Sequence, residues 1–162
     1  MKIKAILLTG ALLAFVVSGF AATPADDKPD FSGKWKMDAA KSDFGAFPGP
    51  DAQTNTIDHK DPKLKINIAA KGGPQGDRSF DRNYTTDGKE STNTQGAQEI
   101  KTVGKWDGKT IVLKSKANFQ GNDVEINETY ALAADGKSLT ITRELKSAMG
   151  EITQKMLFTK ED

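Results

Sequence analysis

Polar and charged side chains recur at positions where the alternation of this sequence predicts an interior. Such positions could hold a ligand through a guanidinium group for an anion, through hydroxyl and amide groups, or through a carboxylate. An unpaired buried charge is costly, so the charged members must either pair with each other or face a wet cavity. The candidate ligand-binding residues are Arg82, Tyr84, Asn93, Glu128, Tyr130, Arg143 and Gln154.

Two interpretations of the charged members stay open. In the first, Glu128 and Arg143 neutralise each other and set the register of neighbouring strands. In the second, Arg143 or Arg82 anchors the anionic or polar head of a ligand in a cavity. Arg82 lies among more polar neighbours and is the better candidate for the ligand contact.

Familiar catalytic and metal-binding motifs find little support. His59 is the only histidine and there is no cysteine, so neither a hydrolase triad nor a His/Cys metal site is indicated. Gly-Lys-Thr at 108–110 and Gly-Lys-Ser at 136–138 lack the earlier glycine of a phosphate-binding loop. We therefore expect no cofactor and no metal. An enzyme that uses Tyr84, Arg82 or Glu128 as acid–base groups remains an alternative.

The N-terminal residues predict export from the cytoplasm. Lys2 and Lys4 precede an apolar run over residues 5–20, and Gly19 and Ala21 form a small-x-small cleavage signal. This pattern is typical of a secretory signal peptide over residues 1–22, with a retained anchor as the alternative. Without cysteine no lipid-modified cysteine can tether the mature protein, so we expect a secreted or periplasmic protein with no membrane span after processing. Residues 23–30 predict a disordered leader.

Charge and length limit the function classes. The 23 basic and 22 acidic residues are interleaved, so no basic stripe indicates nucleic-acid binding. A mature chain of about 140 residues is long enough to form one domain over residues 31–162 with its own core.

The elements that must position the polar residues are strands. Residues 31–38 alternate strictly, with Phe31, Gly33, Trp35 and Met37 on one face. Glycines and prolines in residues 39–52 allow no more than one helical turn. Further strands separated by turn residues, several of them Asp-Gly, are predicted at 53–60, 63–71, 78–86, 90–95, 99–106, 109–119, 123–133, 137–147 and 151–160.

About ten strands in simple succession predict an all-β fold. Charged side chains on the outer face exclude an outer-membrane barrel. An open sheet of this length would leave two long edges, which favours an antiparallel up-and-down β-barrel. A two-sheet sandwich is the alternative.

Turn positions predict which interior residues are neighbours. A turn at Asp135-Gly136 places Glu128 opposite Arg143. A turn at Met149-Gly150 places Met156 opposite Arg143, and one at Asp87-Gly88 places Arg82 opposite Asn93.

The Gly33-x-Trp35 spacing near the start of an all-β chain resembles the calycins, the lipocalins and fatty-acid-binding proteins. The strand count is more similar to a fatty-acid-binding protein, although residues 39–52 are too short for that family's helical lid. The lipocalin resemblance implies a basic residue over the motif tryptophan, and only Lys160 has the right parity. We expect Trp35 to be structural, packed near Phe31, Phe158 and the stem of Lys160.

The resemblance implies a secreted, non-catalytic barrel that binds a small, largely apolar or amphipathic molecule in its interior. The alternative is a filled barrel or sandwich that acts through its surface as a structural or interaction domain.

Overall fold

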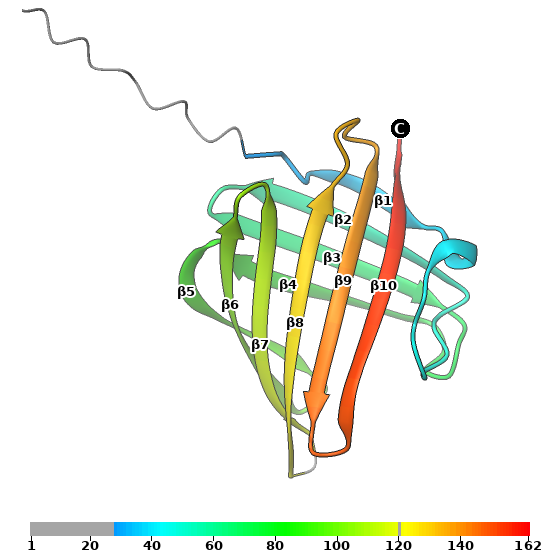
Figure 1. The fold of residues 1–162 in the computed structure, drawn as a ribbon, viewed down its shortest axis with the longest axis vertical. Coiled ribbons are helices and arrows are strands. Elements are labelled where there is room, and N and C mark those ends of the chain that lie inside the picture. Colours follow the sequence, from blue (N-terminus) through cyan, green and yellow to red (C-terminus); the bar gives the residue numbers. More distant parts are fainter. Residues whose placement is uncertain (1–27, 120) are drawn as a thin grey trace, which may run out of the picture.

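A computed structural model describes residues 28–119 and 121–162 (Figure 1). The predicted signal peptide and most of the predicted leader lie outside the described residues. No helix of the described part is long and apolar enough to cross a membrane. The described chain forms one short 3-10 helix, η1 (Ala39–Lys41), and ten strands: β1 (Gly33–Met37), β2 (Ala52–Lys60), β3 (Lys63–Lys71), β4 (Arg78–Thr85), β5 (Asp87–Gln95), β6 (Gln98–Asp107), β7 (Thr110–Phe119), β8 (Asn122–Leu132), β9 (Ser138–Ser147) and β10 (Gly150–Glu161).

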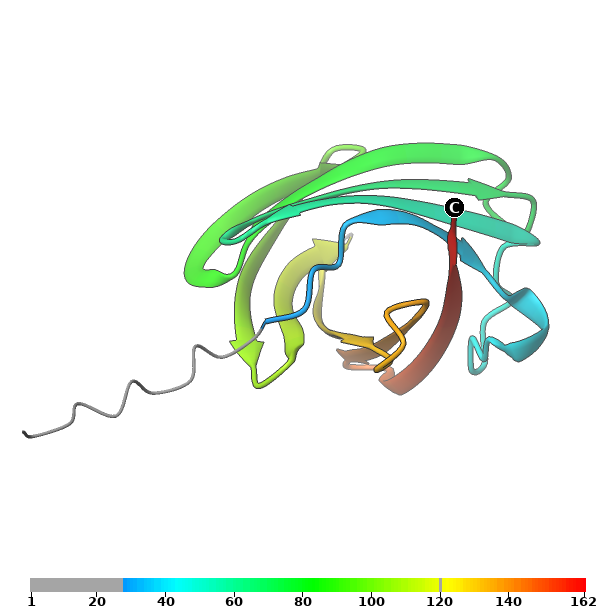
Figure 2. The same ribbon diagram turned by 90° about the horizontal axis from the view of Figure 1, so that it is seen from above.

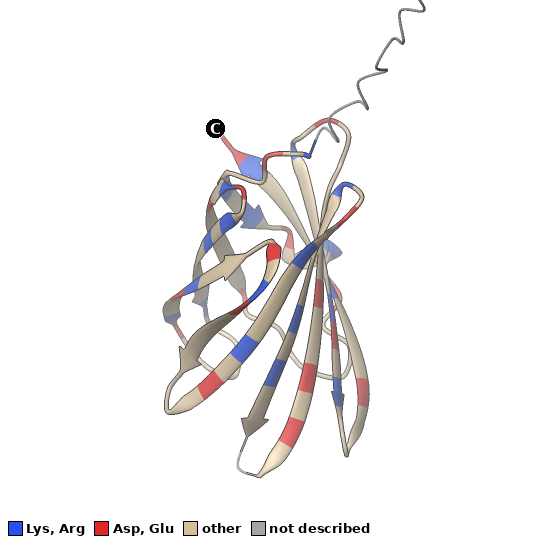
Figure 3. Ribbon diagram, turned by 90° about the vertical axis from the view of Figure 1, so that its left-hand side faces the viewer, with Lys and Arg blue, Asp and Glu red and all other residues tan. Residues whose placement is uncertain are grey.

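All ten strands belong to one antiparallel sheet in the order β4-β3-β2-β1-β10-β9-β8-β7-β6-β5. The first and last strands pair, with Trp35 opposite Lys160. The sheet curves until its edge strands β4 and β5 face each other, so the barrel is nearly closed (Figure 2). The prediction of an all-β up-and-down barrel is confirmed. Figure 3 shows strands with basic residues beside strands with acidic residues, so both signs are mixed over this side of the barrel.

The predicted register is confirmed at one hairpin and wrong at the next. Glu128 lies opposite Arg143 between β8 and β9. Between β9 and β10, Gln154 is the partner of Arg143, and Met156 pairs with Ile141. The error arises because Gly150 already belongs to β10 and pairs with Ser147, so the turn lies one residue earlier. This displacement shifts the partners by two residues and leaves every side chain on its predicted face.

The predicted Asp87-Gly88 turn is also wrong. Both residues lie in β5, where Asp87 pairs with Lys105 of β6. The chain reverses at Thr86, whose backbone N–H donates to the Pro62 carbonyl at 2.8 Å. A backbone ladder pairs β4 with β3 and β5 with β6, but none joins β4 to β5. Arg82 and Asn93 therefore do not form a ladder pair.

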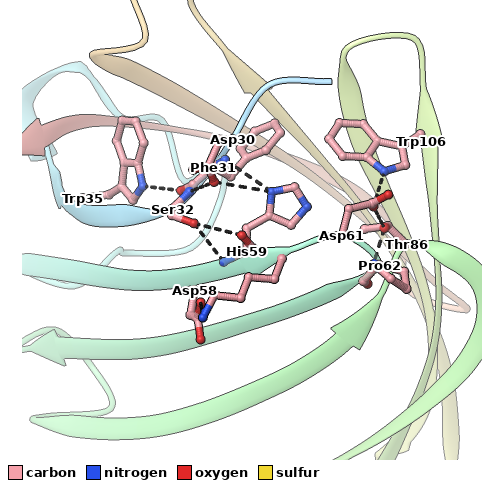
Figure 4. Close-up of polar contacts among 11 residues, drawn as sticks. Asp30, Phe31, Ser32, Trp35, Asp58, His59, Asp61, Pro62, Thr86 and Trp106 are labelled. Atoms are coloured by element: carbon pink, nitrogen blue, oxygen red, sulfur yellow. Dashed lines mark hydrogen bonds and ion pairs between the residues drawn. The ribbon is translucent and has the colours of Figure 1, made fainter. Parts of the chain in front are cut away.

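Trp35 of the G-x-W strand packs near Phe31, Phe158 and Lys160, as predicted, at what we call the closed end of the barrel. Trp35 is fully buried, and its indole Nε1 donates to the Phe31 carbonyl at 2.9 Å (Figure 4). Phe31 and Phe158 belong to the same core cluster, and Lys160 Nζ lies 5.3 Å from the centroid of the Trp35 ring. Gly33 has φ of 137°, and a Cβ there would lie 2.5 Å from Lys160 Cε. A side chain at this position would therefore displace the lysine from the tryptophan.

A polar network surrounds this closed end. Asp61 accepts hydrogen bonds from Thr86 Oγ1 and, at 2.8 Å, from Trp106 Nε1 (Figure 4). Lys28, from the described part of the predicted leader, lies 3.4 Å from the Asp61 carboxylate. These contacts tie the N-terminal segment, the β2–β3 turn and β6 together, so the closed end is held by polar groups as well as by the core.

Candidate ligand-binding site

A cavity of about 500 Å³ occupies the barrel interior. Its lining includes residues 47–50 of the β1–β2 connection and Pro74 and Gln75 of the β3–β4 turn. Phe47 is 52% exposed and Pro74 is exposed, so the cavity reaches solvent between these two loops. We call this opening the mouth. Trp35 is not among the residues that line the cavity.

Most of the predicted ligand-binding residues meet in this cavity. Arg82, Tyr84, Glu128, Tyr130, Arg143 and Gln154 all line it. Asn93 is not among the lining residues and is bonded to Asn83 instead. The apolar part of the wall consists of Phe44, Ile68, Phe80, Ile100, Phe119, Ile126, Leu145 and Met156. Apolar and polar lining residues share the strands β4, β8, β9 and β10, so the cavity combines both kinds of surface.

Glu128 and Arg143 form an ion pair within the cavity wall. Glu128 Oε1 lies 2.8 Å from Arg143 Nε and 2.6 Å from Arg143 Nη2. The Glu128 side chain is 8% exposed and that of Arg143 is 33% exposed, because the guanidinium borders the open cavity. The negative charge of Glu128 raises the pKa of Arg143 above its usual value. The two interpretations of this pair are thus compatible, since the groups neutralise each other and still face the cavity.

Arg82 is buried without such a partner. Within the described residues no carboxylate lies within 4 Å of its guanidinium. Its hydrogen bonds go to neutral acceptors, the Thr94 carbonyl at 3.0 Å and Gln95 Oε1 at 3.0 Å. The guanidinium also lies 4.4 Å from the centroid of the Phe80 ring. Because Arg78, Arg82 and Arg143 line the cavity against the single carboxylate of Glu128, the cavity lining has surplus positive charge.

The two tyrosines are hydrogen-bond donors and not bases. Burial, with a smaller contribution from the charge of Glu128, raises the pKa of Tyr84 and of Tyr130 well above the usual value. Both phenols therefore stay protonated at physiological pH and can donate to an acceptor in the cavity.

The Gln154 side chain both borders the cavity and holds a loop. Its side chain lines the cavity, and its Nε2 donates to the Phe44 carbonyl at 3.2 Å. This bond ties the β1–β2 connection to β10 beside the cavity. Gln154 therefore contributes to holding the cavity wall in place.

Sequence analysis missed the residues of the mouth. Phe44, Phe47 and Pro74 lie in loops, outside the alternating strands on which the interior was predicted. The signal available was the pair of phenylalanines in a Gly/Pro-rich connection, since a loop has no evident reason to carry an exposed aromatic side chain.

No protein-family model matches the chain, and a search of curated proteins finds no match. Solved structures are similar over most of their length. A secretory abundant heat soluble protein from Ramazzottius varieornatus superposes with a TM-score of 0.60 at 21% identity, covering 81% of this chain and 95% of that chain. Zebrafish ileal bile acid-binding protein complexed with cholic acid gives 0.57 at 17% identity, covering 81% and 98%.

A third similar structure is the Schistosoma mansoni fatty acid binding protein in complex with arachidonic acid. It superposes with a TM-score of 0.51 at 13% identity, covering 82% of this chain and 96% of that chain. The chain has a calycin-like fold. In the β1–β2 connection of this chain the helix η1 has three residues, in line with the expectation that residues 39–52 are too short for a helical lid.

Proposed function

We propose that this protein is a non-catalytic container that binds one small, amphipathic molecule with an anionic or polar head. The observation that carries the proposal is the cavity of about 500 Å³, which combines apolar surface with surplus positive charge. This volume falls within the usual range of small-molecule sites.

The chemistry of the wall suggests how the molecule lies. Its apolar part packs against Ile126, Leu145 and the other apolar residues, where removal from water provides the main driving force. Its head lies near Arg82, which lacks a carboxylate partner within the described residues. The neutral phenols of Tyr84 and Tyr130 supply further donors. A charge-assisted hydrogen bond to the head contributes about 1.5–3 kcal/mol, or roughly ten- to a hundredfold in affinity.

Similar structures support this ligand class. The zebrafish protein is complexed with cholic acid and the Schistosoma protein with arachidonic acid, and both molecules join a large apolar body to one carboxylate. The proposal extends this chemistry to the cavity of the present chain.

Export is the second part of the proposal. We infer from Lys2, Lys4 and the apolar run over residues 5–20 that the signal peptide is removed and that the barrel acts outside the cytoplasm. Mass spectrometry of the protein from its source should give a mature chain that begins near residue 23. An unprocessed chain beginning at Met1 would contradict export by this route.

Binding can be tested with N-phenyl-1-naphthylamine, a neutral dye that fluoresces in apolar surroundings. Wild type should enhance its fluorescence, and Leu145→Trp should abolish the effect because Leu145 lines the cavity. The matched control is Leu157→Trp, because Leu157 alternates with the buried Met156 and Phe158 and lies on the outer face of β10. Absence of binding by wild type would refute the container and favour a barrel that acts through its surface. Native mass spectrometry of the purified protein should additionally show a retained small molecule.

A further inference from the structure

Side chains bridge β4 and β5, the two strands that face each other without a backbone ladder. Asn93 Oδ1 accepts from the Asn83 N–H at 2.7 Å, and Asn93 Nδ2 donates to the Asn83 carbonyl at 3.0 Å. One side-chain amide thus provides the two hydrogen bonds that a residue of a neighbouring strand would provide. Ser91 Oγ accepts from the Thr85 N–H at 3.2 Å. We call this set of contacts the seam.

Arg82 belongs to the seam and to the cavity at once. Its Nη1 donates to the Thr94 carbonyl at 3.0 Å and to the Asp81 carbonyl at 3.3 Å, and its Nη2 donates to Gln95 Oε1 at 3.0 Å. Two of these acceptors lie on β5, across the gap from Arg82. The same side chain lines the cavity. The position of the guanidinium therefore depends on how closely β5 approaches β4.

A count of the N–H groups of Arg82 shows which of them a ligand can still use. A guanidinium has five N–H groups, and the seam uses both of those on Nη1 and one on Nη2. The Nε hydrogen and the second Nη2 hydrogen make none of these bonds, and the Tyr84 hydroxyl is close enough to compete with a ligand for one of them. Carboxylates and sulfonates commonly accept two parallel bonds from a guanidinium. The seam thus immobilises Arg82 while leaving two donors for one anionic group.

We propose that the seam is the positioning device of the anion site, and that Asn93 is a positioning residue although it lies outside the cavity lining. This inference rests on the proposed function. Asn93 holds β5 against β4, so that Thr94 and Gln95 can fix the guanidinium. Pre-organisation of this kind raises affinity because the ligand does not have to order the side chain. It does not act on a ligand without an anionic or polar head, since such a ligand does not use Arg82.

Thermodynamic reciprocity adds a second consequence. If a closed seam strengthens anion binding, then a bound anion must strengthen the seam by the same factor. The amide hydrogens of Asn83 and Thr85, which are bonded to β5 side chains, should exchange more slowly in the anion complex.

Two dyes separate anion recognition from cavity binding. The anion 8-anilinonaphthalene-1-sulfonate and the neutral N-phenyl-1-naphthylamine share the same aromatic body and differ by the sulfonate. For Asn93→Ala we expect an affinity loss for the anion of about three- to tenfold, and for Arg82→Met a loss of roughly ten- to a hundredfold. Affinity for the neutral dye should change less than about twofold in both variants, because an apolar ligand does not need the guanidinium.

The matched control is Asn67→Ala. Asn67 Nδ2 donates to Asp81 Oδ1 at 2.7 Å, a bond between β3 and β4 at the exposed surface. Removing it also deletes an asparagine contact to β4 but leaves the seam intact, so both dyes should bind as to wild type. Circular dichroism checks that each variant folds.

The outcomes separate the two proposals. If Asn93→Ala retains wild-type affinity for the anion, the positioning role is refuted and the container stands. If it loses affinity for both dyes equally, Asn93 merely maintains the barrel and the positioning role is again refuted. Binding of neither dye by wild type refutes the container and this inference together.

Hydrogen exchange of the wild-type protein tests the coupling between seam and anion site even if Asn93→Ala does not fold. The sulfonate dye should slow exchange in β4 and β5 more than the neutral dye does. Equal protection by the two dyes, or faster exchange with the anion, would overturn the coupling between seam and site.

Discussion

Replacing Arg143 by methionine removes the only arginine paired with Glu128. The Glu128 side chain, 8% exposed, would then be left as a lone carboxylate in the barrel wall. Breaking a buried ion pair from one side costs about 3–5 kcal/mol. A carboxylate can escape part of this cost by taking up a proton, which costs an ordinary glutamate side chain about 3.7 kcal/mol at pH 7 and about 1 kcal/mol at pH 5.

Two effects place the expected loss of stability at the lower end of this range. Protonation of the carboxylate limits the loss, and the 33% exposure of the Arg143 side chain shows that water can approach the pair through the cavity. We therefore expect Arg143→Met to lower the free energy of unfolding by about 3 kcal/mol at pH 7 and by about 1 kcal/mol at pH 5. The double variant Glu128→Leu/Arg143→Met should lie within about 1 kcal/mol of wild type, because no charge remains buried.

Urea unfolding at both pH values measures these differences, with tryptophan fluorescence as the signal. Lys146→Met is the control, because the Lys146–Glu151 pair of 3.0 Å is exposed and its loss should be undetectable. An Arg143→Met variant as stable as wild type at pH 7 would refute the buried-pair reasoning and show that cavity water solvates Glu128. A loss that is equal at pH 7 and pH 5 would refute the protonation argument.

Two further predictions concern the closed end. Trp35→Ala should cost about 3–5 kcal/mol in urea unfolding, because a fully buried indole is removed; a loss below about 1 kcal/mol would show that the ring does not pack in the core. Burial lowers the pKa of His59, and the opposing charges of Asp30 and Asp61 reduce this shift without cancelling it. The unfolded chain therefore takes up the proton first, and stability should fall as the pH decreases below about 6.5. As His59 is the only histidine, His59→Phe should flatten the dependence between pH 7.5 and 5.5, and a gain in stability on acidification would contradict the reasoning.

His59 shows what the strand pattern could not predict about the closed end. It lies two residues before the turn at Asp61, and the structure buries its ring next to Phe31 and Trp106. Nδ1 accepts from the Phe31 N–H at 3.4 Å, and the buried Nε2 has no partner within the described residues. The segment before β1 covers the rim, and nothing in the alternation of residues 53–60 predicts that cover.

The alternation of the sequence determined the strands and the face on which each side chain lies. Because the period of a strand is two, Glu128, Tyr130 and Arg143 had to point inward once the core face was known. The side chains of β10 also lie on their predicted face, although the β9–β10 turn was predicted one residue too late. Short turns such as Asp135-Gly136 also determined local register, since few residues separate the paired strands.

Only the tertiary structure decided what the interior contains. Whether β4 and β5 form a ladder depends on how the curvature of ten strands closes the barrel, a sum over many distant pairings that no short segment encodes. The gap that results turns Asn93 into a bridge and leaves Arg82 without a carboxylate partner within the described residues. The cavity of about 500 Å³ has the same origin, because its volume is set by the separation of opposite walls and not by the pattern along any one of them.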